Sequence, residues 1–300
     1  MALFLHIGYP KTSTTYLQNY YFNKLDLNFL GKKINHKSWL NSKKRWKYNE
    51  INKVIEQEQY LFIPKKKILI SAESIIGNIW NRNFSKYNFI NNLSKNKNLK
   101  IIITIRKQSN IFYSIYKQYL WEGGKKNFKN FYLDSISKKN EFDINYLDYY
   151  KLLKMINKKF NKKNILIFPS EMISKRYFND FDKKITKFLG IKRKKIKYLN
   201  KLIRTGYSIN EQFYIRFYNK ILNKKLNQHE NQLIFRPTFF KKVFNLKSYL
   251  LKFAHLETVL FKRKISELNK ISYEIDNLFK KSNYKLSKEI GIDLKKFNYY

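Results

Sequence analysis

One short segment of the sequence combines residue types that can bind an anion. It contains a glycine, a proline, a lysine and several hydroxyl residues: Gly8, Pro10, Lys11, Thr12, Ser13, Thr14 and Thr15. The apolar run at 2–8 predicts a buried strand before it, and the spacing of apolar residues predicts a helix over 14–24 after it. Backbone N–H groups at a helix start attract negative charge, and a lysine adds a full positive charge. The 8–15 loop is therefore predicted to bind a phosphate-like group.

A second pair of residues could bind another phosphate. The β-branched run at 99–105 predicts a strand that ends at Arg106, and a helix is expected over 109–121. An arginine can hold a phosphate with two parallel hydrogen bonds. Ser114 and Gln118 lie four residues apart, so they share one face of that helix. Arg106 and Ser114 can therefore converge on one phosphate.

The spacing in the 8–15 loop disfavours a nucleotide kinase. The nucleotide-binding P-loop has the pattern G-x-x-x-x-G-K-[ST]. Here Lys11 comes three residues after Gly8, and no second glycine precedes it. No clear acidic residue after a later strand is placed to hold magnesium beside a triphosphate.

Both segments resemble motifs of the sulfotransferases that use 3′-phosphoadenosine 5′-phosphosulfate (PAPS). The loop of that family is written G-x-P-K-[ST]-G-[ST]-T, and Ser13 stands where the family usually has Gly or Ala. The family also has an Arg at a strand end and a Ser eight residues later, often followed by Tyr and a polar residue. The matching positions here are Arg106, Ser114, Tyr116 and Gln118. Weaker similarities are a strand at 163–168 followed by Glu171, a helix ending at 188–190, and the segment 283–294.

The resemblance implies a role for each matching residue. Lys11 would stabilise the bridging oxygen as it becomes negative, and residues 12–15 would supply N–H and hydroxyl donors. Arg106 and Ser114 would hold the 3′-phosphate of the donor. Arg204, in a basic–Gly segment, would also touch the donor. PAPS is then a co-substrate, adenosine 3′,5′-bisphosphate is the product, and no metal is required.

An acceptor hydroxyl also needs a general base, and Glu73 is the best candidate. It follows the expected strand at 67–72, at the edge where open parallel sheets bind ligands. Sulfotransferases that act on carbohydrates use a Glu in a similar place. The alternatives are a structural role for Glu73 as a helix cap, and His36 as the base. His6, in the middle of a strand, is expected to be a core histidine.

Strands alternate with helices over the first two thirds of the sequence, which predicts an α/β fold. We expect a P-loop-NTPase-like parallel sheet with helices on both faces. The other expected elements are a strand at 27–31 and helices at 49–60, 84–94 and 143–159. After residue 205 only helices are expected, including 208–226 and 246–281. We interpret 1–300 as one domain, with a nucleotide-binding core at 1–200 and a helical part at 201–300 that closes over the acceptor.

Composition excludes several other classes of protein. The sequence has no cysteine and only four histidines, so disulfides and a zinc site are not expected. No apolar run is long enough to span a membrane, and no secretory signal is visible, so we expect a cytoplasmic protein. Nothing in the sequence indicates the oligomeric state.

The formal net charge of +42 suggests nucleic acid or an anionic membrane as a partner. Only nine of the 63 basic residues are Arg, however, and specific recognition of bases and phosphates favours Arg. The lysines accompany abundant Asn, Ile, Tyr and Phe, a bias that A/T-rich codons explain. Specific nucleic-acid binding is therefore the less favoured alternative, and peripheral contact with an anionic membrane is compatible with the charge.

The acceptor is the least defined part of the prediction. A Glu base favours a carbohydrate or glycolipid, and tryptophans could stack on sugar rings or belong to the core: Trp39, Trp46, Trp80 and Trp121. A catalytically inactive sulfotransferase fold that serves as a binding module is a further alternative. It would keep the nucleotide site and transfer nothing.

Overall fold

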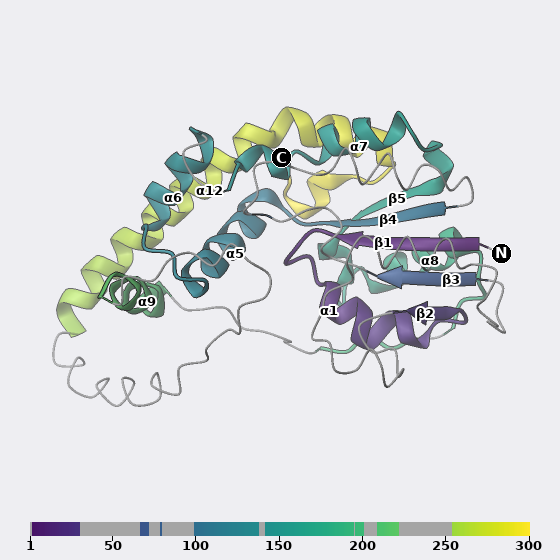
Figure 1. The fold of residues 1–300 in the computed structure, drawn as a ribbon, viewed down its shortest axis with the longest axis horizontal. Coiled ribbons are helices and arrows are strands. Elements are labelled where there is room, and N and C mark those ends of the chain that lie inside the picture. Colours follow the sequence, from purple (N-terminus) through teal and green to yellow (C-terminus); the bar gives the residue numbers. More distant parts are fainter. Residues whose placement is uncertain are drawn as a thin grey trace.

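The computed structural model describes residues 2–30, 67–71, 79, 99–137, 142–194, 196–200, 209–221 and 254–300. Within these residues the strands form one parallel sheet in the order β2-β3-β1-β4-β5 (Figure 1). Their bounds are Ala2–Gly8 (β1), Asn28–Leu30 (β2), Lys67–Ser71 (β3), Leu99–Ile105 (β4) and Ile165–Pro169 (β5). The predicted parallel α/β fold is confirmed.

The strands form where the sequence has continuous apolar and β-branched runs. Strands of a parallel sheet are covered by helices on both faces, so inward and outward positions are both apolar. In β1 every residue from Leu3 to Gly8 is buried, and β4 is almost as completely buried. β1 is the central strand, with β3 on one side and β4 on the other.

The order of the strands determines where a ligand can bind. The chain leaves β1 toward β2 and β3, whereas it leaves β4 in the opposite direction, toward β5. Right-handed connections that run in opposite directions place their helices on opposite faces of the sheet. The point between the carboxyl ends of β1 and β4 is therefore the switch point, where open parallel sheets bind ligands.

The helical segment after β1 changes its winding along its length. It begins as α1 (Thr14–Tyr16), continues as a π-helical turn (Leu17–Tyr21) and ends as a 3₁₀ turn (Phe22–Lys24). It packs against α8 (Phe178–Leu189), which follows β5 and ends at Gly190 in a left-handed conformation (φ 61°). The expected helix over 14–24 is thus present, with mixed geometry.

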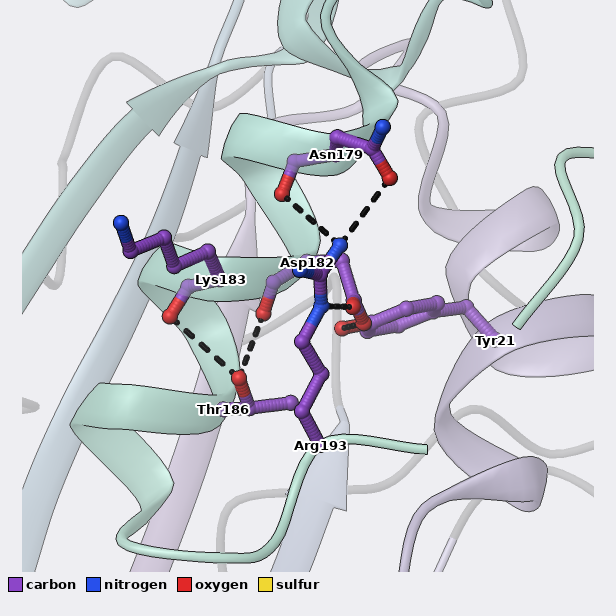
Figure 2. A network of polar contacts seen from close by, with 6 residues as sticks. All are labelled: Tyr21, Asn179, Asp182, Lys183, Thr186 and Arg193. Carbon is purple, nitrogen blue, oxygen red and sulfur yellow. Dashed lines mark hydrogen bonds and ion pairs between the residues drawn. The ribbon is translucent and has the colours of Figure 1, made fainter. Parts of the chain in front are cut away.

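A buried carboxylate joins these two segments. Asp182 of α8 accepts a hydrogen bond of 2.7 Å from the Tyr21 hydroxyl and pairs with the guanidinium of Arg193 (Figure 2). Arg193 also donates to the side chain of Asn179, at 3.0 Å. Burial raises the pKa of Tyr21, and the neighbouring Asp182 raises it further, so the phenol stays protonated and donates. The helical segment that follows the 8–15 loop is therefore fixed to the rest of the fold.

The other described helices are α5 (Gln108–Trp121), α6 (Phe128–Ile136), α7 (Tyr149–Asn157), α9 (Ile209–Ile221) and α12 (Ala254–Ile290). The long α12 runs beside α6 and α7, and α9 lies at the end of the molecule away from the sheet (Figure 1). Every described element after residue 205 is helical, as expected. The expected helices at 49–60 and 84–94 lie outside the described residues.

One expectation about the helices was wrong, and one helix was not expected. The single helix expected at 143–159 is a 3₁₀ turn (Ile144–Leu147) followed by α7. Asp148 separates them because its backbone is extended and its side chain accepts from the N–H of Lys151, which starts a new helix. The unexpected helix is α6, which begins where Asn127 accepts from the N–H of Asn130.

Candidate functional site

The 8–15 loop leaves β1 at the switch point in a tightly held conformation. The N–H of Tyr9 donates to the carbonyl oxygen of Thr104 in β4, at 3.3 Å. The fully buried Thr12 hydroxyl donates to the carbonyl oxygen of Tyr9, at 2.6 Å. This hydroxyl, which was expected to be a donor to a ligand, therefore closes the loop on itself. Lys11 and Ser13 are exposed, whereas Thr14 is buried at the start of α1.

Two residues of this loop adopt left-handed backbone conformations, with φ of 67° at Lys11 and 61° at Ser13. This region is unfavourable for residues with a Cβ and is usual for glycine. Ser13 occupies the position where the similar family usually has Gly or Ala, and the backbone turns there in the way that a glycine permits. The loop is strained at the two residues that flank Thr12.

Gly8 is required by close packing beneath the loop. A Cβ built on Gly8 would lie 2.2 Å from Cγ2 of Thr14 and 3.4 Å from the ring of His6. Neither neighbour can move freely, because both side chains are buried. The start of α1 can therefore approach the end of β1 only if residue 8 has no side chain.

Arg106 and the 8–15 loop are in direct contact. Nη1 of Arg106 donates to the carbonyl oxygen of Lys11, at 3.0 Å. The buried Tyr149 hydroxyl donates to the carbonyl oxygen of Arg106 at 2.6 Å, and the ring of Tyr9 packs edge-on against Tyr149. The two predicted anion-binding segments, 95 residues apart in sequence, thus lie in contact.

Glu171 holds the backbone beside Arg106. One carboxylate oxygen accepts from the N–H of Lys107 at 3.0 Å, and the other accepts from the hydroxyl of the buried Tyr299 at 3.1 Å. Nearby, the side-chain amides of Gln108 and Asn283 donate to one another, and Asn283 also donates to the carbonyl oxygen of Tyr299. The sequence analysis noted Glu171 and the 283–294 segment only as weak similarities. It did not predict that they support the arginine.

A polar network crosses the sheet directly below the loop. His6 is fully buried, with Nδ1 at 2.7 Å from the Ser71 hydroxyl and Nε2 at 2.7 Å from the Thr104 hydroxyl. Gln18 donates to the Ser71 hydroxyl at 3.0 Å. Burial lowers the pKa of His6 to about 3, so its ring is neutral at neutral pH. His6 is a core histidine, as expected, and it connects the carboxyl ends of β3, β1 and β4.

One face of α5 continues the site away from Arg106. Tyr113, Ser114, Lys117 and Gln118 are only partly buried, whereas the opposite face of α5 belongs to the core. Gln118 donates to Glu122 at 2.7 Å. Ser114 lies on the expected face, and Lys117 lies beside it. The sequence analysis did not single out Lys117, although its spacing from Ser114 could have indicated it.

Several predicted residues lie outside the described part of the chain: Glu73, His36, Arg204, Trp39, Trp46 and Trp80. Trp121, at the end of α5, is 42% exposed. The described residues contain no group of three His, Cys, Asp or Glu that could hold a metal ion. Among the helices of the described ranges, none has the length and apolar composition needed to cross a bilayer.

Two sulfotransferases are among the solved structures that resemble this fold. One is a sulfotransferase from Alicyclobacillus acidocaldarius, with 10% sequence identity and a TM-score of 0.43, and the match covers 75% of this chain and 97% of that one. The other is the mouse sulfotransferase SULT7A1 complexed with PAP, with 17% identity and a TM-score of 0.41 over 91% of this chain and 88% of that one. No family model and no curated protein match the sequence.

Proposed function

We propose that this protein is a PAPS-dependent sulfotransferase. The main support is the hydrogen bond between Arg106 and the Lys11 carbonyl, which joins the two segments predicted to bind anions, at the switch point of the sheet. A donor with a phosphate at each of two positions needs two cationic sites at a fixed separation. The 8–15 loop would take the 5′-phosphosulfate, and Arg106 with Ser114 would take the 3′-phosphate.

In the proposed reaction the acceptor oxygen attacks sulfur in line with the bond that breaks. A new S–O bond forms to the acceptor, and the bond from sulfur to the 5′-phosphate oxygen breaks with its electron pair left on that oxygen. Lys11 is exposed in the loop, and its ammonium would neutralise the charge that develops there. The buried Thr12 hydroxyl maintains the conformation of the loop through its hydrogen bond to the Tyr9 carbonyl. The loop would therefore contribute to catalysis by positioning the donor and by electrostatic stabilisation.

The acceptor hydroxyl must lose its proton as it reacts. We propose Glu73 as the base, with His36 as the alternative, because Glu73 comes two residues after Ser71 at the carboxyl end of β3. The end of β3 is held next to β1 through the contacts of Ser71 with His6 and Gln18. A carbohydrate or glycolipid hydroxyl is the proposed acceptor, because sulfotransferases that act on carbohydrates have a Glu in a similar place.

The donor site is tested by a thermal-shift titration at fixed ionic strength. Adenosine 3′,5′-bisphosphate, ADP and ATP with magnesium are compared. A ligand at about one hundred times its dissociation constant stabilises a protein by roughly 2.7 kcal/mol, which raises Tm by several degrees. We expect the bisphosphate to give the largest shift. Equal shifts with all three would mean that the positive charge merely collects anions, and a preference for ATP with magnesium would indicate a kinase.

Turnover is tested separately from donor binding. Lys11→Ala should bind adenosine 3′,5′-bisphosphate measurably but lower the rate of sulfuryl transfer by orders of magnitude, as measured by mass spectrometry of acceptor sugars incubated with PAPS. If Lys11→Ala were as active as the wild type, the role of Lys11 would be wrong. Donor binding without transfer to any acceptor would favour the inactive binding module.

A further inference from the structure

Lys117 is placed on α5 so that its charge lies toward the Arg106 end of the helix. It follows Ser114 by three residues and Tyr113 by four, so the three side chains share one face. Its Nζ lies 4.5 Å from the centre of the Tyr113 ring. Side chains of a helix lean toward its N-terminus, and α5 begins two residues after Arg106. The ammonium therefore extends back along the helix, over the Tyr113 ring and toward the N-terminal end of α5.

The aromatic ring under Lys117 is itself held in place. The Gln212 side chain of α9 donates to the Tyr113 hydroxyl at 2.6 Å. Asn219, two turns further along α9, donates to the carbonyl oxygens of Leu120 and Gly124, both at 2.8 Å. The position of α9 against α5 is thus fixed at both ends. Lys117 rests on a surface that is already formed.

Among the described residues, the surroundings of Lys117 disfavour its positive charge. Partial burial lowers the pKa of Lys117, and the positive charge of Arg106 lowers it further. Glu211 of α9 acts in the opposite direction and raises it, but it does not restore the usual value. Two cations repel one another, and the partly buried one also loses hydration. An anion bound between them offsets both costs by attracting both charges.

We propose that Lys117 is a third binding residue, with Arg106 and Ser114, for one phosphate group. This inference rests on the proposed function, in which that group is the 3′-phosphate of the donor. The guanidinium of Arg106 would then hold the phosphate from the end of β4. The Ser114 hydroxyl and the Lys117 ammonium would hold it from two successive turns of α5. Lys117 would contribute to selection of a 3′-phosphorylated nucleotide over one without that group.

The test compares two ligands that differ only in the 3′-phosphate. Dissociation constants of adenosine 3′,5′-bisphosphate and AMP are measured by calorimetry at fixed ionic strength for the wild type and three variants. Lys117→Gln should weaken the affinity for the bisphosphate by about 10- to 100-fold, which is the range of a charge-assisted hydrogen bond. The affinity for AMP should stay nearly unchanged. Lys117→Arg should keep most of the affinity. Lys129→Gln, at an exposed position of α6, removes the same charge away from the site and should change neither ligand by more than about twofold.

The outcomes separate this inference from the proposed function. If the wild type prefers the bisphosphate and Lys117→Gln keeps that preference, the role of Lys117 is refuted and the donor site stands. If the wild type binds the bisphosphate and AMP equally, the donor site fails, and the inference fails with it. Equal weakening by Lys117→Gln and Lys129→Gln would show that only overall charge matters, which also refutes the role.

Proton uptake gives a second measure that loss of stability would not change. A bound phosphate should raise the pKa of Lys117, while Arg106 lowers it and Glu211 and Tyr113 stay in place beside it. The complex would then keep a proton that the free protein loses at alkaline pH. Binding heats measured at alkaline pH in buffers with different ionisation enthalpies should show more proton uptake in the wild type than in Lys117→Gln, in which Lys11 can still take up a proton. Equal uptake in the two proteins would refute the direct contact.

Discussion

The neutral, buried His6 should make the protein sensitive to mild acid. In the folded state its two ring nitrogens lie 2.7 Å from the hydroxyls of Ser71 and Thr104, and no acidic side chain of the described residues takes part in the network. Burial lowers the pKa from 6.5 to about 3. In the unfolded chain the imidazole is solvated and keeps its ordinary pKa. Between these two values the unfolded state binds the proton and the folded state does not.

The sign and size of the effect follow from this difference. Where the unfolded state binds more protons, stability falls as the pH falls. His6 should therefore have almost no effect above pH 7 and should cost about 2 kcal/mol of unfolding free energy at pH 5, since one pKa unit corresponds to about 1.4 kcal/mol. The loss would keep growing until the pH reaches about 3.

The assay is urea unfolding of the wild type and of His6→Asn between pH 5 and pH 7.5. Asparagine does not titrate and retains a donor and an acceptor, while other acids and the remaining histidines titrate in both proteins. We expect the variant to be less stable at pH 7.5 and the gap to narrow by about 2 kcal/mol at pH 5. Parallel curves would refute the argument. If the variant does not fold, the His6 ring signals in NMR decide, because they should not titrate between pH 5 and 8.

Three further substitutions test the site. Gly8→Ala would force Cβ into Thr14 Cγ2, so we expect a loss of at least about 1–3 kcal/mol in urea unfolding, and an unchanged midpoint would contradict the packing. Ser13→Gly should relieve the strain of a Cβ at a φ of 61°. After the greater entropy of glycine in the unfolded chain is subtracted, we expect the unfolding free energy to rise by about 0.5–1 kcal/mol. A loss of stability would show that the loop is not strained at this residue. Arg106→Ala should weaken the binding of adenosine 3′,5′-bisphosphate by roughly 1.5–3 kcal/mol, as measured by calorimetry. Intact affinity with reduced turnover would show that Arg106 does not bind the 3′-phosphate.

The strands and their carboxyl ends could be predicted because local sequence determines them. Central parallel strands must be apolar on both faces, and the runs at 2–8 and 99–105 match β1 and β4 residue for residue. The nearness of Arg106 to the 8–15 loop depends also on the order of the strands in the sheet, which local sequence does not determine. Strands β1 and β4 are neighbours, and their connections leave in opposite directions.

Features that depend on contacts between distant residues were not predictable in this way. The left-handed conformation of Lys11 has no local signal, because lysine does not favour positive φ. The partners of His6 lie 65 and 98 residues away, and the support of the Lys107 backbone by Glu171 and Tyr299 joins three separate parts of the sequence. Side-chain capping also divided one apolar segment at Asp148.

The hydrogen bond between Tyr299 and Glu171 has a consequence for how the protein is made. The ribosome synthesises Gly8 and the rest of the loop early, but Tyr299 follows roughly 15–60 s later at ordinary rates of translation. Until then Glu171 lacks this partner, and the buried position that Tyr299 fills beside it is empty. The nascent chain would meanwhile expose the apolar surface that α12 covers, and that interval is when chaperones would be needed. Nucleotide binding to stalled nascent chains of increasing length would show whether the site forms before or after Tyr299 is added.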